Sequence, residues 1–363
     1  MKLKKHILFA LIVIQLLNYT AAIQAQEVHY SQPNANALAF NPANTGLFDG
    51  NIRVSAASRI QWLTLNNPFT SFYISADKAV LTNRSFGVGL QINQTKAGVA
   101  SLAHTSIAFS TSYIKPLSRR NATFFSFGMN LGLDRWAFDS NNATFDSQYN
   151  GTIFDVTNAS NEQPFNYSSK FFLNIGAGAV FFHGTDVDKY FVFSIAIDHL
   201  NSYRYQLLEI NADRLAPRIN ALCTMSINLD KNHTYSLLPN ISFVTQGGHR
   251  QSVVGAAFRY VPMAQQKDIN AYVFALRTRL TPNSNIRPRS RITTNVEKLM
   301  FPESVILEAR YEKQQRFSIG MAYDTNVSDL VVSTKSIGAI ELSLMRIFGS
   351  AKSQKGIIKC PGL

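Results

Sequence analysis

Beyond its first 25 residues, the chain has no apolar run long enough to form a transmembrane helix. Such a helix needs about 20 consecutive apolar residues, and no later window offers them. Cysteine is nearly absent, since Cys223 and Cys360 are the only two and lie far apart in the sequence. This spacing excludes a disulfide framework and a zinc site of the C-x-x-C kind.

Residues arranged for catalysis are also missing from the sequence. The seven histidines are dispersed, and no nucleophile, base and orienting group can be named together. The stretch GAG at 176–178 lacks the context of a phosphate loop, and its small residues would instead let one face of a strand pack closely. We therefore predict no enzyme activity, no catalytic or metal-binding residue and no cofactor, with a hydrolase built on a Ser–His pair as a third alternative.

The charge balance is basic, with a net charge of +13 that falls to +10 when the three leader lysines are removed. A basic chain invites a nucleic-acid interpretation. The lysines and arginines are scattered through turns and alternating runs, which is more typical of a charged lumen and of loops at an anionic surface. The sequence therefore predicts no nucleic-acid partner.

Residues 1–25 are typical of an export signal. Three lysines precede a short apolar stretch at 7–17, and small residues follow it. Cleavage after Ala22 or after Ala25 fits the small residues, and an uncleaved anchor helix is the alternative. We expect an exported protein.

The chain is rich in aromatic residues, with 26 Phe and 14 Tyr, and in segments where apolar residues alternate strictly with small or polar ones. From Phe125 to Leu133 every second residue is apolar, while the residues between them are small or polar. Side chains alternate between the two faces of a strand, so this segment predicts a strand with one fully apolar face. The segments 106–113 and 317–324 show the same split.

Segment length favours a barrel in lipid over a soluble sandwich, which would also alternate. The segments run about 9 to 12 residues, as a tilted membrane strand requires, whereas soluble strands centre on about 5 to 6. Aromatic residues recur at segment ends, as interfacial girdles require, at Phe86, Tyr113, Tyr190, Tyr260, Tyr311 and Tyr323.

The fold prediction is an all-β, antiparallel transmembrane β-barrel of about 14 strands behind a cleaved signal peptide. The expected domains are the signal peptide at 1–25, a periplasmic or plug-like segment at 26–50, the barrel at 51–348 and a periplasmic tail at 349–363. Long connections alternate with short ones, as in bacterial outer-membrane barrels. The expected strands lie near 51–61, 70–78, 86–95, 103–114, 123–134, 171–182, 189–198, 216–229, 235–245, 251–261, 270–279, 303–312, 315–324 and 337–347.

Charged residues of both signs fall on the inward parity of these strands. Facing charges could pair across the lumen and fill it, which we favour over the alternative of a charge-selective pore lining. The candidate lumen charges are Arg53, Arg59, Arg277, Arg279, Glu308, Arg310 and Glu341, with Glu312 on the same parity.

Eight motifs, in order, resemble one family, the PorP/SprF outer-membrane proteins of the Bacteroidetes, over nearly the whole mature chain. One departure is the end of the chain, where a basic and an aromatic residue would be expected after Cys360-Pro361. The motifs are HYSQ at 29–32, FNPANTG at 40–46, SRIQW at 58–62, TKAG at 95–98, TFDSQYNG at 144–151, YDTNVSDL at 323–330, GAIELSL at 338–344 and the terminal Cys-Pro.

The resemblance implies an outer-membrane component of the type IX secretion and gliding apparatus, without known enzymatic activity. Members associate with periplasmic machine subunits or with a large secreted surface adhesin. Matching positions are candidate docking or plug residues, namely Asn41, Pro42, Gly46, Tyr323, Asp324 and Asn326.

The stretch FNPANTG precedes the first expected strand, so it belongs on the periplasmic side or in the barrel mouth. Pro42 fixes its own φ and pushes Asn41 towards an extended conformation. Asn44 and Gly46 suit a turn that aims the chain into the first strand. We expect this stretch to plug the barrel or to meet a periplasmic partner.

Two functions remain open at this point. The first is an assembly or attachment barrel in the outer membrane that contacts lipid and partner proteins. The second is a passive channel for small solutes, which the arginine-rich lumen parity and the strand count would support.

Overall fold

Fourteen strands form the barrel in a computed structural model of the chain. The structure describes residues 27–65, 67–80, 85–98, 101–118, 122–137, 146–153, 155, 157–158, 169–186, 189–205, 213–262, 270–282, 300–314, 316–328 and 331–349. The expected signal peptide, most of the tail and Cys360 lie outside these residues. The barrel strands are β1 (Ile52–Gln61), β2 (Phe69–Val80), β3 (Phe86–Ala97), β4 (Leu102–Pro116), β5 (Ala122–Ala137), β6 (Ser169–Asp186), β7 (Lys189–Asp198), β10 (Arg218–Asn228), β11 (Tyr235–Gln246), β12 (His249–Tyr260), β13 (Asn270–Pro282), β14 (Met300–Lys313), β15 (Phe317–Asn326) and β16 (Ile337–Phe348).

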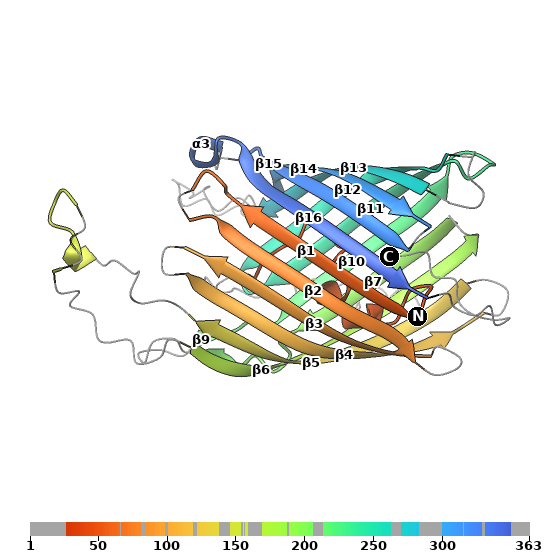
Figure 1. Ribbon diagram of the computed structural model, residues 1–363, viewed down its shortest axis with the longest axis horizontal. Coiled ribbons are helices and arrows are strands. Elements are labelled where there is room, and N and C mark those ends of the chain that lie inside the picture. The colour runs from red at the N-terminus through yellow and green to blue at the C-terminus, as the bar shows by residue number, and fades with distance from the viewer. Residues whose placement is uncertain are drawn as a thin grey trace, which may run out of the picture.

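Every barrel strand pairs antiparallel with its two neighbours, and the sheet closes on itself (Figure 1). The closing seam joins β1 to β16 from Ile52–Phe348 through Gln61–Ala339. The prediction of an antiparallel barrel of 14 strands is therefore confirmed. Several strands exceed their predicted bounds; β6, expected at 171–182, spans 18 residues, because ladder pairing continues through polar residues such as His183 that apolar alternation does not mark.

The two ends of the barrel differ in the length of their connections. The end where β1 begins and β16 finishes, called the inner end, carries the connections 81–85, 117–121, 187–188, 229–234, 261–269 and 314–316. The opposite, outer end carries the long connections 138–168, 199–217, 283–299 and 327–336. Outer-membrane barrels have short periplasmic turns and longer extracellular loops, so the inner end faces the periplasm.

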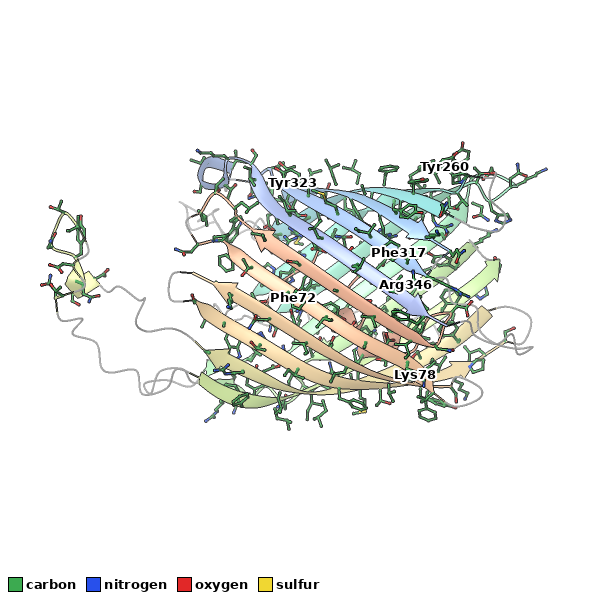
Figure 2. All side chains as sticks on the ribbon, viewed as in Figure 1. Phe72, Lys78, Tyr260, Phe317, Tyr323 and Arg346 are labelled. Carbon is green, nitrogen blue, oxygen red and sulfur yellow. The ribbon has the colours of Figure 1, made fainter. Side chains whose placement is uncertain are left out.

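The outward face of the barrel is an apolar belt. Phe72 projects from β2 into this belt (Figure 2), and Phe127, Leu131 and Leu133 of β5 are each more than half exposed. A surface of this kind is stable only against lipid.

Aromatic side chains gather near the inner end, as an interfacial girdle requires. Tyr235, Tyr260, Tyr272 and Tyr311 form a continuous series across β11 to β14, with ring centroids 5.3, 6.4 and 5.6 Å apart. The prediction for Tyr190 is wrong, because its ring stacks on buried Phe182 and packs against a lumen cluster. Tyr190 does lie at a strand end, as predicted, but it is on the face of β7 that points into the lumen.

Small elements complete the described fold. A two-stranded sheet joins β8 (Arg204–Tyr205) to β9 (Asp213–Arg214) in an outer connection. The short helices α3 (Val331–Thr334) and η3 (Asp146–Gln148) lie in two others. None of the helices among the described residues is long and apolar enough to cross a membrane.

The lipid-facing belt predicts that a charged substitution destabilises the protein more at the middle of a strand than near its end. Leu131 lies midway along β5 and is 55% exposed, whereas Phe171 lies near the outer end of β6 and is 69% exposed. Leu131→Arg should lower the free energy of unfolding in lipid vesicles by about 2–4 kcal/mol, and Phe171→Arg by about 1 kcal/mol or less. Denaturant titration measures both, and equal costs would contradict the assigned membrane position.

Candidate functional site: the plugged lumen

Residues 27–50, called the plug from here on, lie inside the barrel. Figure 1 shows its short helices α2 (Ala37–Phe40) and η1 (Pro42–Asn44) within the ring of strands. At the outer end, the Glu27 amide donates to Gln246 Oε1 at the end of β11 (3.3 Å). At the inner end, the Asn51 amide donates to the Phe348 carbonyl (2.8 Å). The chain therefore runs along the lumen from the outer end to the inner end before β1 begins.

Asn41 and Pro42 together begin η1. Asn41 has the extended backbone expected before a proline (φ −158°, ψ 120°), and its side chain accepts the Ala43 amide proton at 2.8 Å. Pro42 occupies the first helical turn, where it loses no intrahelical hydrogen bond. The same asparagine is thus both a helix cap and the residue that sets the entry angle.

The Asn41 amide group also joins the plug to two strands. Its Nδ2 lies 2.8 Å from Ser194 Oγ and 3.0 Å from the carbonyl oxygens of Ala179 and Ile195. The side chain is fully buried, so losing it would leave acceptors of β6 and β7 unsatisfied. Unsatisfied buried acceptors are costly.

Glycines on the lumen face allow η1 to approach the wall this closely. A Cβ at Gly128 would collide with the backbone of Pro42 and Ala43, and one at Gly178 would collide with the Asn41 side chain. Any larger residue at either position must displace the plug or bend the strand.

Serines and an apolar collar complete the inner contact. Ser126 Oγ donates to the Ala43 carbonyl and Ser112 Oγ to the Thr45 carbonyl, both at 2.6 Å. Ala43 and Leu47 belong to one buried cluster with inward residues of β4 to β7, namely Ile114, Phe124, Val180, Phe182 and Val192. The plug and this cluster therefore fill the part of the lumen that lies beside β4 to β7.

An aspartate and an arginine hold the exit of the plug. Asp77 of β2 accepts the Gly46 amide proton at 2.7 Å and a two-point hydrogen bond from Arg53 of β1 at 2.9 Å. Arg53 also donates to the Asn44 carbonyl and lies over the Phe48 ring. Gly46 has a φ of 74°, which favours glycine at this turn.

A four-charge network holds the outer half of the plug at Ser31 and Gln32. Both residues donate their backbone amides to Glu341 of β16. Ser31 Oγ donates to Asp324 of β15. Arg59 of β1 and Arg279 of β13 pair with Asp324 at 2.8 and 2.7 Å, and Arg59 also pairs with Glu341. Two buried cations thus balance two buried anions around the plug backbone.

A second series of charges runs across the neighbouring strands. Arg277 pairs with Glu308, Arg310 lies between Glu308 and Glu312 at 3.4 and 3.1 Å, and Arg259 pairs with Glu312 at 3.2 Å. Each named acid thus lies between cations, so these side chains pair with one another across strands.

Glu27, at the outer end of the plug, is held by His199 (2.8 Å) and Arg218 (3.0 Å). Burial acts to raise the pKa of Glu27, but the charges of His199 and Arg218 outweigh burial and hold this pKa well below its usual value. Burial acts to lower the pKa of His199, but Glu27 outweighs it and raises that pKa to about 9. This contact is therefore a charged pair at neutral pH.

The candidate residues do not form one site. Asn41, Pro42 and Gly46 lie in the plug, and Asp324 lies in the network around Ser31. Asn326 donates to Thr334 near the outer end, and Tyr323 has the outward parity of β15. The seven candidate lumen charges all have inward parity, and each pairs with an opposite charge.

The chain matches, over residues 22–345, the family described as type IX secretion system membrane protein PorP/SprF. This match spans most of the sequence. The chain belongs to the PorP/SprF family. It is thus a membrane component of the type IX secretion system, and its 14-stranded barrel with a lipid-facing belt places it in the bacterial outer membrane.

Solved barrels resemble this PorP/SprF protein only distantly. The Ralstonia pickettii toluene transporter TbuX is 10% identical, with a TM-score of 0.46, covering 86% of this chain and 93% of its own. The monoaromatic hydrocarbon channel CymD is 9% identical, with a TM-score of 0.42, covering 90% and 95%. Haemophilus ducreyi BamA lacking POTRA domains 1–3 is 8% identical, with a TM-score of 0.39, covering 82% and 70%. No curated protein matches the chain.

Several contacts of this PorP/SprF lumen were not predicted from sequence. Ser31 and Gln32 belong to the HYSQ motif, which gave no hint of its partners. For Gly128 and Asp77, the sequence indicated only that they lie on the inward face of their strands. At Gly178, the stretch GAG at 176–178 did suggest close packing. Within the described part of the chain, no group of three or more His, Cys, Asp and Glu side chains could hold a metal ion.

The glycine contact predicts a position-specific effect on the plug. Gly128→Ala should displace η1 and lower the free energy of unfolding by about 1–3 kcal/mol, as overpacking does. Hydrogen exchange at the amides of Ala43, Asn44 and Thr45 should accelerate with it. Gly132→Ala is the matched control, because it lies on the same face of β5 but meets Ala108 and the Ile107 carbonyl oxygen. Unchanged protection of η1 in Gly128→Ala would contradict the close contact.

Proposed function

We propose that this PorP/SprF protein is an assembly or attachment barrel of the type IX secretion and gliding machinery, not a solute channel and not an enzyme. Its partners would be periplasmic subunits of that machinery or a large secreted surface adhesin. Family membership supports the machinery, and the lumen supports the role within it.

The observation that carries the proposal is the plug packed inside the lumen. A passive channel needs a continuous path for solute, but η1 and the apolar collar fill the lumen beside β4 to β7. The plug is fixed by buried hydrogen bonds from Asn41, Ser112 and Ser126. Opening a path along the plug would break these hydrogen bonds together, whereas a passive pore conducts without breaking buried contacts.

The burial of Asn41 and Pro42 supports a role in the plug over a role in a docking surface. In this proposal they hold the barrel in one shape, and partners meet the barrel at its ends. The inner end offers periplasmic subunits the short turns, the exposed Asp49 and Asn51, and the expected tail at 349–363.

A deletion strain distinguishes the attachment role from the channel role. Loss of the gene should abolish secretion or surface motility while uptake of small solutes stays normal. Returning the wild-type gene should restore the secretion or motility that was lost. In the complemented strain, a photo-crosslinker placed at Asp49 should recover a periplasmic subunit, whereas one at lipid-facing Phe72 should not.

The reverse pattern would overturn the proposal. Normal secretion and motility with impaired solute uptake would favour the channel. A phenotype that required one Ser–His pair would instead favour an enzyme.

A further inference from the structure

We propose that the outer half of the lumen is a binding site for an extended polypeptide segment that carries an aromatic side chain and enters from the outer side of the membrane. The inference deepens the proposed function, on which it rests, by naming where an exported partner would attach. The site is a cavity of about 430 Å³ at the outer end, called the vestibule from here on.

The vestibule lies beside the outer end of the plug. Val28 and His29 of the plug border it, and the outer ends of β1 to β5 and β12 to β14 form its walls. Its volume is within the range of ligand pockets, about 300–1,000 Å³. Its wall residues lie at the outer ends of the strands, so we expect a ligand to enter from the outer end.

The lumen wall already binds one extended polypeptide, the plug itself. Glu341 accepts two successive plug amides, Gln246 accepts the Glu27 amide, and Arg218 donates to the Val28 carbonyl. These bonds run from wall side chains to peptide groups. Gln61 and Gln251 bring the same kind of side chain to the vestibule wall, since each amide side chain has both a donor and an acceptor.

Aromatic residues form one wall of the vestibule. Trp62 and Phe69 meet edge to face, with centroids 5.0 Å apart and planes at 86°. Trp136 stacks on His104 at 4.3 Å, and its Nε1 donates to the Tyr203 hydroxyl. Aromatic side chains held in this way are the usual anchors of polypeptide recognition.

The backbone at Trp62, in the turn after β1, has a positive φ, as it does at several other residues of the described chain. Its φ is 58°, in the left-handed region that a bulky residue rarely adopts. Its amide donates to the Gly338 carbonyl of β16, which holds the turn in place. Strain of this kind is retained at binding sites, and here it keeps the indole on the vestibule wall.

The charges around the vestibule argue against a phosphate or a lipid headgroup as the ligand. Arg59 and Arg279 border the cavity, but both already pair with Asp324. Glu27 is likewise matched by His199 and Arg218. A site without surplus cations favours a neutral peptide backbone over a multiply charged anion.

The chain carries its own probe of this site. Trp62 and Trp136 are its only two tryptophans, and both line the vestibule, so tryptophan emission reports directly on occupancy. The full mature protein in nanodiscs would be titrated with the peptides acetyl-GSFGSFGS-amide and acetyl-GSAGSAGS-amide. Maltoheptaose and inorganic phosphate would be titrated separately, and acrylamide quenching would measure exposure of both indoles.

The phenylalanine peptide should change the emission saturably and protect the Trp62 indole from acrylamide, since Trp136 is already buried. The alanine peptide should bind at least about fivefold more weakly, because it lacks the ring. Phe69→Ala should weaken the phenylalanine peptide by about fivefold or more, and Leu102→Ala should weaken it in the same direction. Phe72→Ala, on the lipid side of the same strand, should bind like the wild type.

Three results would overturn the proposal. The first is the absence of any saturable response to either peptide, and the second is a response to maltoheptaose or phosphate in place of the peptide. The third is full protection of the Trp62 indole in the free protein, which would mean that the chain's own residues before Glu27 fill the vestibule. None of these bears on the secretion phenotype, so failure here leaves the proposed function to its own test.

Discussion

The close approach of the η1 backbone to the lumen-facing glycines is the contact on which the rest of the structure depends. A barrel of eight strands can be filled by its own side chains, but one of fourteen encloses more space than side chains alone can occupy. Gly128 and Gly178 have no side chain, which leaves space for a second layer of polypeptide against the wall. Asn41 then satisfies backbone acceptors of that wall, so plug and barrel form one packed unit.

The balance of chemistry that holds the plug differs between its two ends. At the inner end, neutral hydrogen bonds and the apolar collar are joined by a single ion pair, Arg53–Asp77. At the outer end, Asp324 and Glu341 hold the plug with arginines around them. Removing one member of such a network leaves a buried charge without a partner, which costs several kcal/mol. The outer network therefore fixes the plug backbone where it borders the vestibule, while η1 and its collar obstruct the lumen.

Alternation along the chain is sufficient to predict the barrel, because each strand has one apolar and one polar face. Parity alone also places Arg59 and Glu341 in the lumen. It cannot show that Glu341 accepts the amides of Ser31 and Gln32, since that contact joins segments at opposite ends of the sequence. Tyr190 shows a second limit of prediction from sequence. An aromatic residue at a strand end can face the lipid or the lumen, and only the exact register of the strand decides which face it takes. The path of the plug depends on shape complementarity to glycines, and the sequence indicated close packing only at GAG 176–178, without showing what packs there.

The plug thus runs through the lumen and leaves a vestibule at the outer end, which suits a barrel that holds a partner on the outer surface and does not conduct solutes. Recording from single wild-type proteins in planar lipid bilayers tests this arrangement most directly. The account predicts no stable open conductance, because η1 and its collar obstruct the lumen. A large, stable conductance in the wild-type protein would contradict it.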